Sequence, residues 1–351
     1  MTVLQKKPGK PPTIRDVAAR AGVSPMTVSR VLNACVRVSP KTKSAVEQAI
    51  KELHYIPNAS AKALSATDFR RIALLHSDSM TSAYVGELLL GALQEASDQH
   101  VYLVMEHYVP GDTPQAVLSQ IAAAHVGGVI LPPPLCDWEE LIEALLAEGL
   151  AVVAIAPDRE RDNVPRVYVD DRRAAYEMTS HLFALGHERI AFVNGHPAHR
   201  GSQRRLEGFK EAHAHHLKAL DDELIVPGDF SFKSGLEAGE KLLGSGSPPT
   251  AIFACNDDMA AAVLTVAHQQ MISVPAQLTI CGFDDTPLAS SIWPNLTTVR
   301  QPIQQMSRAA VKILSLAMLS GPQTTQEDGK GSVQLGFQIV RRQTDAIPAY
   351  H

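Results

Sequence analysis

Short apolar runs alternate with amphipathic helical stretches along the chain from residue 71 onward. This alternation is typical of parallel β-strands that are joined by helices. The predicted strands form one series at 72–75, 101–105, 127–131 and 152–155, and a second at 189–193, 224–226, 251–254 and 278–281. Helices are expected between the strands of the second series, for example over 172–185 and 202–216. Two similar series predict a bilobed α/β body in which each lobe contains a doubly wound parallel sheet.

Residues 1–57 show a different pattern, with short helical stretches and no strand-like runs. Thr13 can cap a helix over 14–21, whose apolar positions fall at i, i+3, i+4 and i+7. Gly22 follows where a left-handed residue would end that helix. A second short helix follows the turn, so the pattern predicts a small all-α helix-turn-helix domain whose second helix enters the DNA major groove.

The second helix is expected to begin with Ser24 as its N-cap and Pro25 at its first position. Its buried stripe leaves an outward face of residues that can meet DNA, namely Met26, Thr27, Ser29, Arg30 and Asn33. A guanidinium group can bond the edge of guanine with two parallel hydrogen bonds. Arg30 is therefore the best candidate for reading a guanine.

Charge along the chain is uneven, since residues 1–62 hold 11 Lys and Arg against 3 Asp and Glu. The net charge of residues 1–62, which we call the head, is therefore +8. Because the whole chain has a net charge of −5, the remaining residues carry −13. A third helix is predicted from Pro40, with Lys41 and Lys43 available for phosphates and a core formed by Val46, Ala49, Ile50 and Leu53. A basic head on an acidic body indicates that the head binds a polyanion, with nucleic acid as the leading candidate. The alternative, a disordered basic arm, is opposed by the periodic apolar residues.

Residues 58–70 connect the head to the body through small and polar side chains and one isolated leucine, Leu64. An apolar side chain of this size can be inserted as a wedge between base pairs in the minor groove. The segment is therefore expected to be a hinge that also contacts DNA. The alternative for Leu64 is that it caps the domain that follows.

Composition limits the class of protein to which this chain can belong. It has 351 residues, of which 45% are hydrophobic and 20% charged, as in ordinary globular proteins. Its 4 cysteines are scattered with no Cys-x-x-Cys pair, which favours a reducing compartment over a disulfide framework. We find neither a signal peptide nor an apolar stretch approaching the roughly 18 residues of a membrane span, so a cytoplasmic location without membrane contact is expected.

Polar side chains follow several of the predicted strands. Parallel sheets bind ligands at the carboxyl ends of their strands, so a cleft between the lobes is expected to hold a small molecule. Carboxylate, amide and guanidinium groups suit a hydroxyl-rich ligand such as a sugar, and an aromatic ring can cover its apolar face. The residues expected at this site are Ser77, Tyr84, Arg205, Asn256, Asp284 and Gln301. The alternative is that several of these polar residues cap helices, because Asp257 and Asp285 stand at expected N-cap positions.

Motifs for catalysis, metal binding or cofactor binding are not found, and none of these functions is expected. The pair His196 and His199 and the tract 213–216 lack further ligands for a metal, so their histidines are expected to be solvated. Two alternatives remain open beside a DNA-binding regulator. One is a sugar-binding protein without operator function, and the other is a cytoplasmic sugar-modifying enzyme.

The motifs resemble those of the lactose-repressor (LacI/GalR) family of bacterial transcription regulators. In the head they are Ile14-Arg15-Asp16-Val17-Ala18, Ala21-Gly22-Val23-Ser24, Thr27-Val28-Ser29-Arg30-Val31-Leu32-Asn33 and Tyr55-Ile56-Pro57-Asn58. In the body they include Arg205-Leu206-Glu207-Gly208-Phe209, Gly282-Phe283-Asp284-Asp285 and Leu296-Thr297-Thr298-Val299-Arg300-Gln301. The resemblance covers roughly residues 13 to 342 and implies a periplasmic-binding-protein-like core of two lobes.

The resemblance also implies roles for individual residues. Base contacts are expected from Pro25, Met26 and Arg30, phosphate contacts from Thr27, Ser29 and Asn33, and intercalation from Leu64. The full set expected at the DNA is Thr13, Ser24, Pro25, Met26, Thr27, Ser29, Arg30, Asn33, Tyr55, Asn58, Ala61 and Leu64. Effector contacts are expected from Arg205, Asn256, Asp284 and Gln301. Where relatives place an aspartate on the ligand, this sequence has Ala156-Pro157-Asp158.

The domain boundaries expected from this resemblance place three crossings between the lobes, near 169, 300 and 332. The expected domains are a DNA-binding domain over 1–57, a hinge over 58–70, a first lobe over 71–168 and 302–331, and a second lobe over 169–301 and 332–351. The tail after Arg342 lacks heptads, which favours a homodimer. The expected function is a homodimeric regulator, most simply a repressor of carbohydrate-utilisation genes. Its affinity for a pseudo-palindromic operator would change when a sugar or related metabolite binds.

Overall fold

The first of the two compact units into which the chain divides is Met1–Phe69, and the second is Arg70–His351. The computed structural model describes residues 14–23, 27–28, 31, 40–53, 70–77, 82–320 and 331–348. Each unit is considered by itself below.

In the first unit, helices α1 (Ile14–Ala21) and α3 (Pro40–Leu53) pack against each other. Gly22 follows α1 with a φ of +67°, and the Val23 amide donates to the Ala18 carbonyl at 3.0 Å, so the predicted left-handed end of this helix is confirmed. The small core, drawn from both helices and from the short helical stretch at Thr27 and Val28, comprises Val17, Ala18, Val28, Val46 and Ala49.

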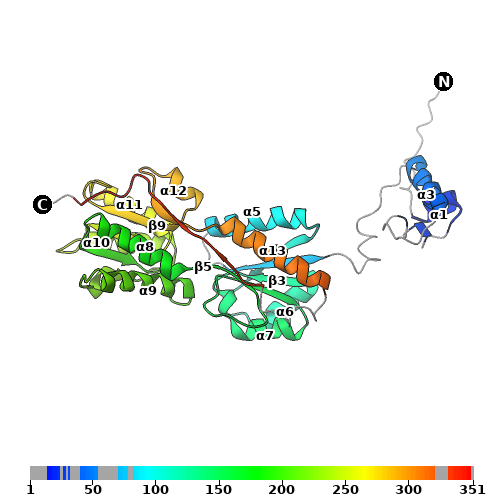
Figure 1. Ribbon diagram of the computed structural model, residues 1–351, viewed down its shortest axis with the longest axis horizontal. Helices are drawn as coiled ribbons and strands as arrows, with labels where there is room; N and C mark the ends of the chain where they lie inside the picture. Colours follow the sequence, from blue (N-terminus) through cyan, green and yellow to red (C-terminus); the bar gives the residue numbers. More distant parts are fainter. Residues whose placement is uncertain are drawn as a thin grey trace, which may run out of the picture. The chain divides into compact units, whose positions relative to one another are not determined.

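The first lobe of the second unit is a parallel six-stranded sheet with strand order β11-β5-β4-β3-β1-β2. Its strands are β1 (Arg71–Ser77), β2 (Tyr102–Tyr108), β3 (Gly128–Leu131), β4 (Ala151–Ile155), β5 (Arg166–Val169) and β11 (Val333–Leu335). Its helices are α5 (Ser82–Asp98), α6 (Pro114–Ala124), α7 (Glu139–Ala147) and α13 (Ile303–Ser320), with a 3-10 turn η1 (Leu135–Asp137). Helices α5 and α13 cover one face of the sheet and α6 and α7 the other, so each face buries its own apolar cluster (Figure 1).

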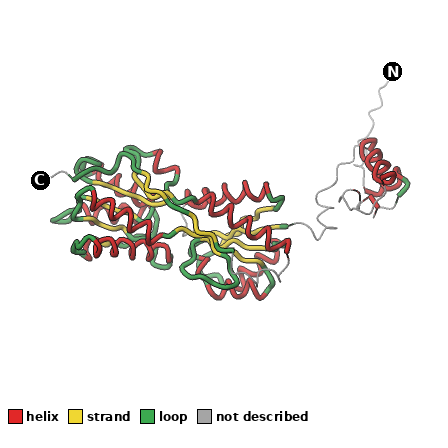
Figure 2. The backbone as a smooth tube through the Cα atoms, viewed as in Figure 1, coloured by secondary structure: helices red, strands yellow, loops and turns green. Residues whose placement is uncertain are grey.

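The second lobe is a six-stranded sheet with strand order β12-β10-β9-β8-β6-β7. Its strands are β6 (Ile190–Val193), β7 (Ile225–Val226), β8 (Ala251–Ala254), β9 (Thr279–Asp284), β10 (Thr297–Arg300) and β12 (Gln338–Val340). Its helices are α8 (Asp171–Ala184), α9 (Arg200–His215), α10 (Phe232–Leu243), α11 (Asp257–Gln269) and α12 (Pro287–Ser291), with a 3-10 turn η2 (Asp222–Leu224). As Figure 2 shows, helices flank the strands of both lobes, which agrees with the predicted doubly wound folds.

The chain passes between the lobes after β5, after β10 and between β11 and β12. Because β11 pairs with β5 in the first sheet, residues 333–335 belong to the first lobe, and the boundary predicted at 332 is too early. Strand β12 pairs with β10 in the antiparallel direction, so the second sheet is parallel except at this edge. Strands β11 and β12 have three residues each, one of them a glutamine, and neither strand is buried, so no continuous apolar run indicates them.

In the part of the chain that the structure describes, no helix is long and apolar enough to cross a lipid bilayer.

Helices α8 and α9 pack side by side, and Gly208 lies at their closest approach. A Cβ atom there would lie 2.0 Å from the Arg172 carbonyl oxygen and 2.9 Å from the Tyr176 nitrogen. We therefore expect Gly208→Ala to lower the free energy of unfolding by about 1–3 kcal/mol, because backbone atoms must move apart. Gly86, on α5, has no atom within 4 Å of its Cβ position, so Gly86→Ala should instead stabilise by up to about 1 kcal/mol through helix propensity. Urea denaturation of both variants checks this, and equal effects would contradict it.

Candidate functional site

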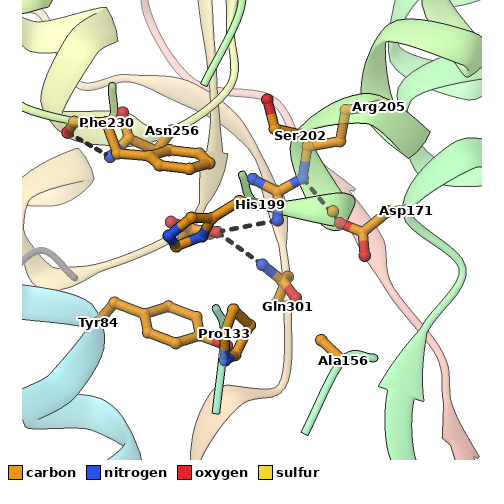
Figure 3. Close-up of a pocket in the computed structure, with 12 residues that line it drawn as sticks. Tyr84, Pro133, Ala156, Asp171, His199, Ser202, Arg205, Phe230, Asn256 and Gln301 are labelled. Atoms are coloured by element: carbon orange, nitrogen blue, oxygen red, sulfur yellow. Dashed lines mark hydrogen bonds and ion pairs between the residues drawn. The ribbon is translucent and has the colours of Figure 1, made fainter. Parts of the chain in front are cut away.

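A pocket lies between the two lobes of the second unit, lined by residues from both. Most of these residues follow a strand at the point where it ends, which is the edge at which parallel sheets bind ligands. The pocket is therefore where the sequence predicted a cleft for a small molecule. The lining residues are Tyr84, Pro133, Ala156, Asp171, His199, Gly201, Ser202, Arg205, Phe230, Asn256, Asp284 and Gln301 (Figure 3).

The two lobes contribute different chemistry to the lining. The first lobe supplies Tyr84 from α5, Pro133 after β3 and Ala156 after β4, so its surface is mainly apolar. The second lobe supplies nearly all of the polar groups, among them Asp171 at the start of α8 and Asp284 at the end of β9. A ligand in this pocket would therefore be held by polar contacts to one lobe and covered by the other.

Arg205 of α9 is the central cation of the pocket and is almost fully buried. Its Nε donates to Asp171 Oδ1 at 2.7 Å, and its Nη2 lies 3.8 Å from Asp284 Oδ1. The guanidinium also stacks over the Phe283 ring, 3.6 Å from its centroid, and donates to the Cys255 carbonyl oxygen. Burial lowers the pKa of Arg205, but the two carboxylates outweigh burial and raise the pKa above its usual value. Arg205 thus carries a charge that is already matched inside the protein.

Asp284 is held in an uncommon backbone conformation with a φ of +107°. Its Oδ1 accepts a hydrogen bond from Gln301 Nε2 at 2.6 Å. Burial raises the pKa of Asp284 to about 7, although Arg205 and Gln301 both act in the opposite direction. Burial also raises the pKa of Asp171, and Arg205 opposes this as well. Two carboxyl groups beside one guanidinium leave the pocket without excess positive charge.

Asn256 lines the pocket and also caps α11. Its Oδ1 accepts from the Met259 amide at 3.0 Å, and its Nδ2 donates to the Phe230 carbonyl oxygen at 2.9 Å. The N-cap predicted at Asp257 is therefore wrong by one residue, since the Asp257 carboxylate instead accepts from the Thr298 hydroxyl at 2.6 Å.

The N-cap predicted at Asp285 is also wrong. Thr286 occupies the N-cap of α12, while Asp285 forms ion pairs with Arg300 and Arg342, each at 2.6 Å. The cap was misplaced because neighbouring aspartates are equally suitable by residue type alone.

The structure brings five of the six predicted effector residues to one pocket, as the lining shows for Tyr84, Arg205, Asn256, Asp284 and Gln301. Ser77 is the exception. It is the last residue of β1 and is buried, but it is not among the lining residues.

Three lining residues that matter for the chemistry were not predicted: Asp171, His199 and Phe230. Asp171 follows β5, a short strand that the apolar pattern did not indicate. Phe230 lies in a loop with a φ of +71°, for which residue type gives no signal. The prediction that the histidines are solvated is wrong for His199 and for His213, which are 6% and 2% exposed. Aromatic packing explains their burial, since each ring lies within 5.0 Å of a phenylalanine ring centroid.

Ion pairs of Asp158 with two arginines of α9 join the lobes beside the pocket, the longer of them to Arg200 Nε at 4.0 Å. Asp158, in the loop after β4, accepts from Nε of Arg204 on α9 at 2.9 Å, and Nη2 of the same arginine lies 2.8 Å from the carboxylate. The Asp158 amide donates to Asp137 Oδ1 at 2.8 Å, which fixes the loop. The segment Ala156-Pro157-Asp158 thus places Ala156 in the lining and turns the Asp158 carboxylate toward the opposite lobe.

The predicted DNA contacts fall almost entirely outside the described residues. Only Thr27 is described, as a half-buried residue in a helical segment. The contacts that lie outside are Thr13, Ser24, Pro25, Met26, Ser29, Arg30, Asn33, Tyr55, Asn58, Ala61 and Leu64. Within the described ranges, no group of three or more His, Cys, Asp or Glu side chains could hold a metal ion.

Comparison with known proteins gives consistent matches for both units. A family model for bacterial regulatory proteins of the lacI family matches residues 13–58, and one for a periplasmic binding protein-like domain matches 179–344. The chain is 36% identical over 299 residues to the HTH-type transcriptional regulator DegA of Bacillus subtilis, covering 84% of this chain and 88% of DegA.

Solved structures give the same result. The fold is similar to the lac repressor dimer bound to operator and the anti-inducer ONPF, with a TM-score of 0.81, 28% identity, and coverage of 96% of this chain and 100% of that one. It is also similar to the complex of transcriptional regulator CelR with cellobiose, with a TM-score of 0.71, 29% identity, and coverage of 95% and 99%.

The raised pKa of Asp284 predicts a pH dependence of stability. An ordinary aspartate with a pKa of 3.8 releases its proton in the unfolded chain, while the folded protein keeps it up to about pH 7. Folding therefore takes up a proton in this range, and the free energy of unfolding should fall as pH rises from about 4 to 7. Asparagine tolerates a positive φ and does not titrate. Asp284→Asn should therefore reduce the slope of stability against pH by up to about 1.4 kcal/mol per pH unit. Asp162→Asn at an exposed position is the control for the change in net charge. A slope unchanged by Asp284→Asn in urea denaturation at several pH values would refute the assignment.

Proposed function

The chain belongs to the LacI family of bacterial transcriptional regulators, and we propose that it is a repressor whose affinity for its operator is set by a sugar bound between its lobes. One observation carries this proposal. A lacI-type DNA-binding segment and a pocket lined by Arg205, Asp284 and Gln301 occur in one chain. Its relatives are regulators rather than enzymes, and we place its activity in the cytoplasm, where operator DNA is found.

On the DNA side, two heads of a homodimer would bind the two halves of a pseudo-palindromic operator. The similar lac repressor structure, a dimer bound to operator, supports this arrangement. We assign Arg30 to a guanine and Met26 to apolar contact with a base edge, because proline at position 25 has no amide hydrogen to donate. Thr27 and Asn33 would fix phosphates and so set the register.

On the ligand side, the pocket suits a ring that carries several hydroxyl groups. The similar CelR structure holds cellobiose, which supports a sugar as the ligand here. We assign Arg205 and Asp284 to polar contacts with this sugar, together with Gln301. Tyr84, which reaches the pocket from the first lobe, would cover its apolar face.

Coupling between the two functions follows from which lobe each group belongs to. A ligand that contacts polar groups of the second lobe and Tyr84 of the first binds differently to open and closed lobes, so it shifts the population between them. Residues 58–70 join the DNA-binding head to the first lobe. A change in lobe angle would therefore change the spacing of the two heads of the dimer and their affinity for the operator. The contact of Asp158 with Arg204 would favour the closed arrangement.

Arg30→Ala tests the DNA side. The operator is first obtained by selecting bound fragments from a random duplex library. The variant should then lose about 1–3 kcal/mol of binding free energy on that operator and lose its preference at one base pair.

Lys41→Ala is the matched control for Arg30→Ala. It should weaken binding to all sequences equally and reduce the salt dependence of log K by about one unit, as expected for a phosphate contact. Uniform loss for Arg30→Ala, measured by fluorescence anisotropy, would reassign Arg30 to a phosphate.

A double-mutant cycle tests the contact between the lobes. Asp158→Asn, Arg204→Gln and the double variant should show a coupling of about 0.2–1 kcal/mol in the affinity for a sugar found by thermal-shift screening, because the pair is partly exposed. The control cycle uses Arg173 and Glu177, an ion pair within α8 whose members lie in one lobe. It should show no coupling in sugar affinity, and equal coupling in both cycles would exclude a role for Asp158 in lobe closure.

A further inference from the structure

His199 lines the pocket and has a buried ring nitrogen that makes no hydrogen bond within the described residues. The residue occupies the N-cap position of α9, and its backbone is fixed because its amide donates to the His196 carbonyl at 3.0 Å and its carbonyl accepts from the Ser202 amide at 3.1 Å. The side chain is buried, with the residue 6% exposed. Its Nε2 is buried without a hydrogen-bond partner among the described residues. An unpaired buried nitrogen of this kind destabilises the folded protein, so its retention calls for an explanation.

The surroundings of His199 are aromatic. Its ring lies 5.0 Å from the Phe230 ring, and in Figure 3 it is drawn in the space between Phe230 and Tyr84. Burial lowers the pKa of His199 to about 4, and His196 and Arg205 lower it further in the same direction. The imidazole is therefore neutral at physiological pH, and its Nε2 accepts a hydrogen bond in the tautomer that carries the proton on Nδ1.

The remaining hydrogen-bonding capacity of the pocket includes several acceptors. The Ser202 hydroxyl donates to Asn194 Oδ1, and both ends of the Asn256 amide are bonded within the protein. In contrast, Asp171 and Asp284 each use only Oδ1, which leaves Oδ2 of both carboxylates without a hydrogen bond in the described chain. Arg205 Nη2, 3.8 Å from Asp284 Oδ1, lies beyond hydrogen-bond distance and is a remaining donor. A ligand that satisfies this pocket therefore needs hydroxyl groups, which both donate and accept hydrogen bonds.

Charge excludes one class of sugar. Arg205, the guanidinium in the lining, is paired with Asp171 at 2.7 Å and lies 3.8 Å from Asp284. A phosphate or carboxylate on the ligand would meet these two carboxyl groups and would have to displace one of them from Arg205. Like charges brought together in a buried site are strongly unfavourable.

We propose that His199 selects the ligand, an uncharged hydroxylated ring that donates one hydroxyl hydrogen to His199 Nε2 and others to the free oxygens of Asp171 and Asp284. This inference rests on the proposed function, because it concerns the same pocket. It adds a residue that determines specificity and excludes sugar phosphates and uronates as ligands. In the free protein the unpaired His199 Nε2 lowers the stability of the fold. The correct ligand removes this penalty because it forms a hydrogen bond with that nitrogen.

The test compares His199→Phe, which removes the nitrogen, with His199→Gln, which keeps a polar group at a similar distance. His268→Phe is the control, since His268 is exposed and does not line the pocket. Each full-length protein is titrated calorimetrically with D-glucose, D-galactose, D-ribose, D-xylose and cellobiose, and with glucose 6-phosphate and D-glucuronate. Thermal melting without ligand is measured for each variant.

For the neutral sugar that binds wild type most tightly, His199→Phe should lower the affinity about 5- to 150-fold, His199→Gln should recover part of it, and His268→Phe should leave it unchanged. Without ligand, His199→Phe should melt no lower than wild type, because it removes a buried unpaired nitrogen.

A lower melting temperature with unchanged sugar affinity would overturn the role of His199. Tighter binding of an anionic sugar, or no binding of any neutral sugar, would overturn the ligand class. Selection of a specific operator from random duplex separates these failures from a failure of the proposed function, which would yield no operator at all.

Discussion

The buried ion pair of Arg205 with Asp171 is the interaction on which the pocket depends. It connects α9 to the start of α8, and the same guanidinium reaches the end of β9 through Asp284 and the end of β8 through the Cys255 carbonyl. Removing a partner from such a pair leaves an uncompensated buried charge, which costs far more than the pair itself contributes. The position of the polar wall of the pocket is therefore fixed by the fold of the second lobe before any ligand arrives.

The first lobe adds little polarity to this arrangement, and that asymmetry gives the pocket its regulatory potential. Tyr84, Pro133 and Ala156 cover the polar wall from the other side, and the pair of Asp158 with Arg204 spans the lobes beside them. In the mechanism that we propose, ligand contacts to the polar wall and to this cover differ between open and closed lobes. A difference in binding free energy between two states is what a ligand needs in order to shift them.

Many of the strands and helix ends could be predicted from the sequence because they depend on the residues within or next to them. Strands such as β4 and β8 are buried on both faces and appear as continuous apolar runs, and Gly22 marks the end of α1 through its positive φ. The short strands β5, β11 and β12 could not be predicted, because each mixes polar or exposed residues with apolar ones and so forms no continuous apolar run. For the same reason Asp171 was missed. His199 was expected to be exposed to solvent. It is buried by the ring of Phe230, which lies far from it in the sequence, so the residues next to His199 do not indicate this contact.

Coupling between the pocket and the DNA is tested most directly by the operator dissociation constant of the full-length dimer, measured with and without a saturating neutral sugar that calorimetry shows to bind. We expect this constant to change about 5- to 150-fold in either direction, the range typical of coupling between two sites. We also expect the operator to change the sugar affinity by the same factor, as linkage requires. A sugar that binds the pocket at saturation and leaves the operator dissociation constant unchanged would contradict this coupling.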